Sequence, residues 1–88
     1  MKKETGVLYR TDGRVETVYP HDGRKFTLEE LQSFVGGYIE KVPGTQRRGN
    51  PIAYCNEDGL FEHLPPNFNA SEKFHIDLVG DVIQVKRT

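Results

Sequence analysis

The stretch Lys25–Glu40 predicts a helix together with both of its ends, and this constrains the fold more than any other part of the sequence. Thr27 is a typical N-cap residue, and Glu30 follows three positions later, which is the spacing of a capping box. An apolar face is predicted by residues at helical spacing, namely Leu28, Leu31, Phe34 and Val35. Gly36 and Gly37 supply a left-handed residue that ends the helix.

Alternating or β-branched segments on either side of this helix predict strands. They cover residues 6–10, 14–19, 38–42, 51–55 and 82–86, with a brief return strand at Leu60-Phe61. Asn67 is expected to cap a short helical turn, and Gly59 to take a positive φ in the turn that follows residue 55. We therefore expect an α+β fold: a small antiparallel or mixed sheet of about five strands with one main helix packed on one face, in the order β-β-α-β-β-(short helix)-β.

Length and composition suit a small globular protein. The chain has 88 residues, 28% of them charged, with a formal net charge of −1. We interpret residues 1–88 as one domain with an exposed loop at 43–50. The lone cysteine excludes an internal disulfide framework, and neither a signal peptide nor an apolar run long enough to cross a bilayer is present. We therefore expect a cytoplasmic protein that does not contact membranes.

Residue types with metal-binding or catalytic chemistry are few and poorly spaced. His21, His63, His75 and Cys55 contain no paired ligand spacing, so we predict no metal site and no cofactor. Cys55 ends an apolar strand, where a small buried side chain is the ordinary role. No nucleophile motif surrounds a serine, and we assign no catalytic residue. The sequence thus favours a non-enzymatic protein.

A small basic cluster falls in and beside the predicted loop. Lys41 precedes it, and Arg47 and Arg48 lie within it. These cations suit a nucleic acid or another anionic ligand, but a basic stripe with interleaved aromatic residues is missing. Nucleic-acid binding is therefore an alternative function rather than the leading one.

Several phrases occur together and in order along the chain. They are Phe-Thr-Leu-Glu-Glu-Leu-Gln at 26–32, Val-Gly-Gly-Tyr-Ile-Glu at 35–40, Cys-Asn-Glu-Asp-Gly-Leu at 55–60, Leu-Pro-Pro-Asn-Phe-Asn-Ala at 64–70 and Val-Gly-Asp-Val at 79–82. From about residue 15 to 85, the chain resembles a family of small domains of unknown function, number 3846, carried by phages, plasmids and integrated elements. The resemblance implies an accessory protein of a mobile genetic element; it supplies no catalytic residue.

Polar residues of these phrases form the candidate site. They are Tyr38, Glu40, Asn56, Glu57, Asn67 and Asn69. Our hypothesis is that they meet at one rim of the sheet and bind a ligand or partner; the alternative is that they are turn and cap residues that the fold requires. An unknown protein partner is the leading expectation. A small-molecule or nucleotide site near Tyr38 and Glu40 remains the other alternative.

Overall fold

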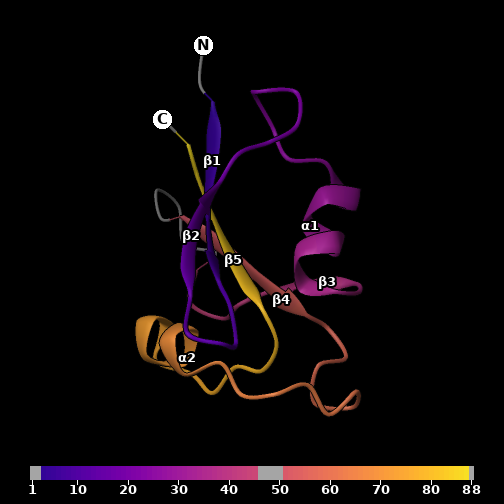
Figure 1. Ribbon diagram of the computed structural model, residues 1–88, viewed down its shortest axis with the longest axis vertical. Helices are drawn as coiled ribbons and strands as arrows, with labels where there is room; N and C mark the ends of the chain where they lie inside the picture. Colours follow the sequence, from indigo (N-terminus) through magenta and orange to yellow (C-terminus); the bar gives the residue numbers. More distant parts are fainter. Residues whose placement is uncertain (1–2, 46–50, 88) are drawn as a thin grey trace.

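A computed structural model of the protein describes residues 3–45 and 51–87. Within those residues, five strands form one antiparallel sheet in the order β2-β1-β5-β4-β3 (Figure 1). The elements along the chain are β1 (Glu4–Tyr9), β2 (Val15–Val18), α1 (Leu28–Val35), β3 (Ile39–Lys41), β4 (Ile52–Asn56), α2 (Phe68–Phe74) and β5 (Val82–Arg87). The α+β class is confirmed. The position of β5 in the middle of the sheet could not be predicted from local patterns.

Helix α1 begins and ends as its sequence predicts. The Thr27 hydroxyl accepts from the Glu30 N–H at 3.1 Å, and the Glu30 carboxylate accepts from the Thr27 N–H at 2.9 Å. The other oxygen of Glu30 accepts from the His21 N–H at 2.8 Å, which ties the preceding loop to the helix. Gly36 ends the helix with φ 78°, and its N–H donates to the Gln32 carbonyl at 2.8 Å. The capping box therefore fixes both the helix start and the chain that leads into it.

One face of the sheet is covered by α1. Its buried core consists of Leu8, Phe26, Leu31, Val35 and Ile83. Leu28 was expected on the apolar face but is 55% exposed. At this end of the helix the core position is taken by Phe26, which belongs to the same buried cluster as Leu31 and has the spacing of a hydrophobic staple.

The opposite face of the sheet is covered by α2 and the segments that flank it. Its buried core consists of Tyr9, Val42, Ala53, Cys55, Ala70, Leu78 and Val82. The rings of Tyr9 and Phe74 meet edge to face with centroids 5.7 Å apart. Residues of one strand alternate between the two cores, since Leu8 packs towards α1 and Tyr9 towards α2. The short helix thus completes a second hydrophobic layer.

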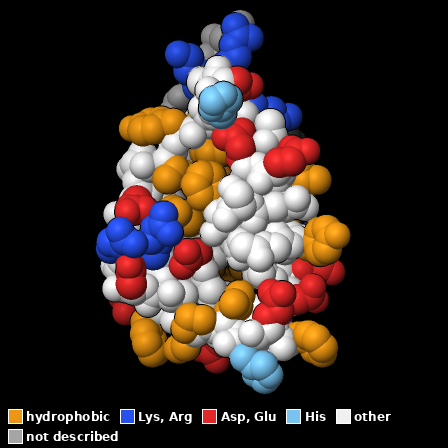
Figure 2. All heavy atoms as spheres, turned by 45° about the vertical axis from the view of Figure 1, so that its right-hand side comes forward, with side chains coloured by type: hydrophobic (Ala, Val, Ile, Leu, Met, Phe, Trp, Pro, Cys, Tyr) orange, Lys and Arg blue, Asp and Glu red, His pale blue; other side chains and the backbone are white. Residues whose placement is uncertain are grey.

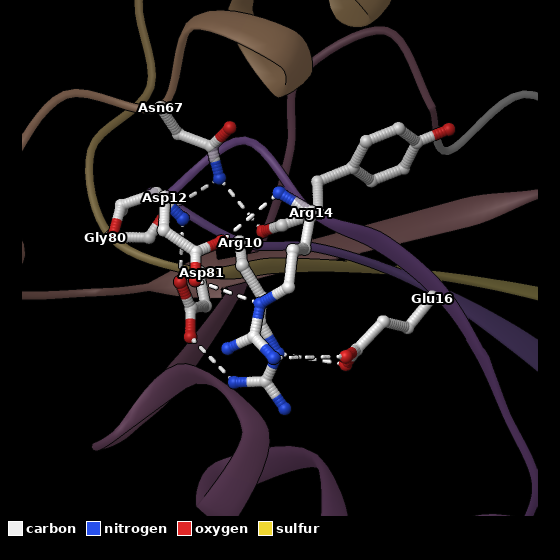
Figure 3. A network of polar contacts seen from close by, with 9 residues as sticks. Arg10, Asp12, Arg14, Glu16, Asn67, Gly80 and Asp81 are labelled. Carbon is white, nitrogen blue, oxygen red and sulfur yellow. Dashed lines mark hydrogen bonds and ion pairs between the residues drawn. The ribbon is translucent and has the colours of Figure 1, made fainter.

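A polar network holds the β1–β2 turn against the start of β5 (Figure 3). Arg10 Nε donates to Glu16 at 2.7 Å, and its Nη1 lies 3.4 Å from the Asp81 carboxylate. Asp81 also accepts from the Thr11 N–H at 2.9 Å. The Asp81 side chain therefore joins residues that are 70 positions apart, in addition to following Gly80 in a turn.

The segment after β3 is only partly described. Pro43 and Gly44 are exposed, whereas Thr45 is buried. The Thr45 hydroxyl donates to the Val42 carbonyl at 2.7 Å and accepts from the Ala53 N–H at 3.1 Å. Residues 46–50 of the predicted loop, with Arg47 and Arg48, lie outside the described residues.

Candidate functional site

Asn56, the last residue of β4, connects three parts of the molecule. Its amide nitrogen donates to the Val35 carbonyl at the end of α1 at 3.3 Å and to Glu62 Oε1 at 3.0 Å. Its amide oxygen accepts from the Asp58 N–H at 2.8 Å. The side chain is 5% exposed. A Cβ at Gly37 would lie 2.8 Å from Asn56 Nδ2, so the chain leaving α1 approaches this amide as closely as only glycine permits.

The turn after Asn56 is closed by its own backbone. The Gly59 N–H donates to the Asn56 carbonyl at 3.2 Å, and the Glu62 N–H donates to the Asp58 carbonyl at 2.8 Å. His63 then takes a left-handed conformation with φ 56°. Gly59 does not have the positive φ that we predicted; a Cβ there would instead lie 2.8 Å from Val79 Cγ2. Close packing, rather than backbone angle, explains this glycine.

Two large apolar side chains project from this closed turn. Leu60 is 80% exposed and Phe61 is 86% exposed. The prediction of a short return strand here is wrong, because the residues from Glu57 to His63 form a succession of hydrogen-bonded turns. In a turn of this kind the backbone is satisfied internally, and the side chains at its tip are left without a hydrophobic layer to enter.

Two hollows flank the turn. The first, of about 380 Å³, lies towards α1 and is lined by Gln32, Gly37, Tyr38, Asn56, Asp58 and Glu62. The second, of about 280 Å³, lies towards the α2 side of the sheet, and its lining includes Glu40, Glu57, Leu60, Phe61 and Asp77. Asn56 and Asp58 contribute to both. The turn therefore separates two adjoining depressions on one part of the surface.

Four of the six residues of the candidate site come together around these hollows. Tyr38 lines the first, Glu40 and Glu57 line the second, and Asn56 lines both. Tyr38 and Glu57 also pair through the backbone, since the Glu57 N–H donates to the Tyr38 carbonyl at 2.8 Å. Tyr38 and Glu40 therefore line different hollows.

The two remaining asparagines of the candidate site contact other parts of the fold. Asn67 is fully buried and caps α2, with its amide oxygen 3.0 Å from the Ala70 nitrogen. Asn69 donates to the Gly13 carbonyl at 2.9 Å, which links α2 to the β1–β2 turn. Neither residue lines the two hollows. Lys41 is an exposed residue at the end of β3.

Negative charge surrounds the exposed apolar residues. The chain has no Lys or Arg from residue 51 to 72, but it has Glu57, Asp58, Glu62 and Glu72 in that interval. In Figure 2 hydrophobic and acidic side chains are interspersed over the lower part of the visible face, whereas the Lys and Arg side chains lie at the top and at mid-height on the left, next to other acidic side chains. Although the net charge of the chain is near zero, the turn region is therefore acidic.

Cys55 lies beneath the second hollow but is not arranged as a nucleophile. Burial raises the pKa of its thiol to about 11, and the neighbouring Glu40 carboxylate, 3.9 Å from Sγ, acts in the same direction. A thiol of this kind is protonated at neutral pH and reacts slowly.

Across residues 3–45 and 51–87, no group of three or more His, Cys, Asp or Glu side chains is placed to hold a metal ion. In the same part of the chain, no helix has the length and apolarity to span a membrane.

Sequence reasoning missed Leu60 and Phe61, the most exposed apolar residues of the site. A signal was present, because an adjacent Leu-Phe pair stands between Asp58-Gly59 and Glu62, too close to the turn to reach a core. Gln32, Asp58 and Glu62 were also outside the predicted set. These three residues line the first hollow because α1 ends beside the turn, and that proximity depends on the order of the strands in the sheet.

Comparison with known proteins identifies the family without identifying an activity. Searches of curated proteins and of solved structures found no match to this chain. A family model described as "Domain of unknown function (DUF3846)" matches residues 5–88, which is nearly the whole sequence and includes both the turn and the two hollows. The chain therefore belongs to the DUF3846 family.

Proposed function

We propose that this protein is a non-enzymatic binding module that docks a partner protein through the turn after β4. The surface consists of Tyr38, Glu57, Asp58, Leu60, Phe61 and Glu62, and we refer to it as the turn surface. The observation that carries the proposal is the exposure of Leu60 and Phe61, at 80% and 86%, on a turn whose backbone is closed by hydrogen bonds. Large apolar side chains held in water in this way are typical of interaction sites.

Rigidity makes these side chains suitable anchors. The Asn56 amide fixes the turn to α1 and to Glu62, so little backbone freedom is lost when a partner binds. Aromatic residues that insert into a partner's pocket commonly supply most of the binding free energy. Phe61 is accordingly the main anchor, with Leu60 beside it, and the hollows on either side of the turn receive side chains of the partner.

The charge around the anchors selects the partner's chemistry. Glu57, Asp58 and Glu62 are exposed next to Leu60 and Phe61, with no Lys or Arg in this part of the sequence. A complementary partner has an apolar pocket with Lys and Arg on its rim. Such charges accelerate association and exclude acidic competitors, and their effect weakens as salt screens them.

The biological setting follows from the resemblance of the chain to domains carried by phages, plasmids and integrated elements. In that setting the module serves the element as a cytoplasmic accessory protein, and its basic partner is a protein of the host or of the element. The absence of a nucleophile arrangement at Cys55 supports a role in binding rather than in catalysis.

Site-specific photo-crosslinking in the host cell tests this proposal. A photo-reactive phenylalanine analogue is placed at position 61 and, as the matched control, at position 68, because Phe61 and Phe68 are both exposed and only Phe61 belongs to the turn surface. We expect one crosslinked partner at position 61 and none at position 68. The partner should have a basic surface, and its affinity for the purified protein should fall at least tenfold with Phe61→Ser and decrease with added salt.

The contrary results are equally specific. Equal crosslinking at both positions, or a purified partner whose affinity is unaffected by Phe61→Ser, would rule out the turn surface as the docking site. Copurification of nucleic acid, with binding that depends on Lys41 rather than Phe61, would favour the nucleic-acid alternative. Phe68→Ser serves as the control for any general effect of removing an exposed aromatic ring.

A further inference from the structure

Strand β2 presents unused hydrogen-bonding groups at one edge of the sheet, where it has β1 as its only neighbour among the described strands (Figure 1). The Arg10 N–H donates to the Arg14 carbonyl at 2.9 Å, so these two residues form a hydrogen-bonded pair of the β1–β2 ladder. Hydrogen-bonded pairs alternate with non-hydrogen-bonded pairs along such a ladder. The other hydrogen-bonded pairs are therefore Leu8 with Glu16 and Gly6 with Val18. In an antiparallel pair the hydrogen-bonding groups of alternate residues point to opposite sides, so those of Val15 and Thr17 point away from β1.

The outward side of this edge continues beyond the strand. Tyr19 precedes Pro20, and a residue in that position is restricted to extended backbone. Val15 is 53% exposed and Tyr19 is 68% exposed. Two of the large exposed hydrophobic residues of the protein therefore belong to one short edge, on either side of Thr17.

The only charged residue within β2 is Glu16. Glu16 is engaged within the molecule, with Arg10 at 2.7 Å and Arg14 at 3.5 Å. The opposite edge, β3, is shorter and places Glu40 and Lys41 at its surface. Exposed charges on a short strand discourage edge-to-edge contact, whereas an edge of β-branched and aromatic residues permits it.

We propose that β2 pairs with the β2 strand of a second copy of this chain, antiparallel, with Thr17 opposite the partner subunit's Thr17. This register joins outward-pointing groups on both strands and forms about six main-chain hydrogen bonds. It places Val15 against the partner subunit's Tyr19, which is a favourable aromatic and β-branched pair. The two sheets become continuous across a two-fold axis, and the contact is closed and symmetric.

A register shifted by one hydrogen-bonding pair is less favourable. It would centre the contact on Glu16 and place this carboxylate directly opposite the partner subunit's Glu16. Like charges that face each other across strands are destabilising. It would also leave Tyr19 without an apolar residue opposite, since the corresponding position is Gly13.

Self-association through β2 is independent of the proposed partner binding. Strands β1 and β5 lie between β2 and β4, from which the turn surface extends. A dimer formed through β2 therefore leaves both turn surfaces accessible. Loss of one interaction by mutation is expected to leave the other intact.

Cysteine crosslinking distinguishes the two registers. In the proposed pairing the two Thr17 Cα atoms are about 5.5 Å apart, which suits a disulfide, whereas the two Glu16 Cα atoms are about 8 Å apart. We expect Thr17→Cys to form a disulfide-linked dimer rapidly under an added copper–phenanthroline oxidant. The matched variant Glu16→Cys should form little disulfide-linked dimer under the same conditions. The native Cys55 is buried and stays in both proteins.

Sedimentation equilibrium from micromolar to millimolar protein provides the second measurement. We expect the wild type to dimerise with rising concentration and Thr17→Pro to stay monomeric with an unchanged circular dichroism spectrum. Proline at 17 removes an outward N–H and leaves the ladder to β1 intact. A wild-type protein that is monomeric throughout, a dimer that Thr17→Pro does not dissociate, or faster crosslinking of Glu16→Cys would each overturn the proposal.

Discussion

The side-chain amide of Asn67 donates to the Tyr9 carbonyl at 2.8 Å, across 58 positions of sequence. The same nitrogen donates to the Gly80 carbonyl at 2.9 Å, and the amide oxygen accepts from the Ala70 N–H at 3.0 Å. One buried side chain thus satisfies the end of β1, the approach to β5 and the start of α2. This residue is part of the framework and has no surface on which to meet a ligand.

Asn67→Ala is expected to lower the free energy of unfolding by about 2–4 kcal/mol, because it removes three buried hydrogen bonds and takes the side-chain acceptor away from the Ala70 N–H. Asn69→Ala should cost less than about 1 kcal/mol, since its single bond to Gly13 is exposed to water. Urea denaturation of both variants measures the difference. Equal effects would show that the buried network contributes little to stability.

Leu31→Ala should destabilise the protein by about 2–4 kcal/mol, because Leu31 is buried against the sheet and its truncation leaves a cavity. Leu28→Ala is the matched control on the same helix. With more than half of its surface in water, Leu28 should change stability by no more than about 0.5 kcal/mol. Thermal melts of the two variants test which side of α1 faces the core, and a larger loss for Leu28 would contradict the packing described.

Stability should depend on pH through Glu30. Hydrogen bonds from the backbone N–H groups of Thr27 and His21 lower the pKa of this carboxyl below its ordinary value of 4.5. A carboxyl whose pKa is lowered by folding stabilises the protein above its unfolded pKa, and that contribution disappears as the pH falls through the folded pKa. Glu30→Gln should therefore melt at a lower temperature than the wild type at neutral pH, and the gap should narrow below pH 4.5. A constant gap would show that Glu30 acts by packing alone.

The thiol of Cys55 should be unreactive in the folded protein. Its pKa of about 11 leaves almost no thiolate at neutral pH, and its burial restricts access. We expect labelling with a thiol reagent at pH 8 to be at least a hundredfold slower without denaturant than with it. Rapid labelling of the native protein would mean that this region opens readily and that the hollow beside it is deeper than the structure shows.

Local signals predicted the elements, and tertiary contacts decided their roles. Thr27, Glu30 and Gly36 specify the ends of α1 through bonds within a few residues of each other, so they are readable from the sequence. Asn67 was correctly expected as a cap, but its contact with Tyr9 depends on a distant strand. The contact between the Asp81 carboxylate and the β1–β2 turn likewise depends on residues 70 positions away and could not be read from the sequence.

The sequence predicted only part of the candidate site for the same reason. Tyr38, Glu40, Asn56 and Glu57 lie on neighbouring strands β3 and β4 or immediately beside them, so a hairpin brings them together. Leu60 and Phe61 resembled a strand, because apolar residues after a turn ordinarily pair back. The internal hydrogen bonds of the turn prevent that pairing and leave both side chains in water.

The position of β5 between β1 and β4 has a consequence for how the chain folds. The first strand of the sheet forms its ladder with the last, from Glu4 opposite Arg87 to Tyr9 opposite Val82. Before residues 82–87 leave the ribosome, the β1–β2 and β3–β4 hairpins have no strand to join them. The addition of β5 is therefore expected to be a late and largely non-local folding step that joins the two halves of the sheet.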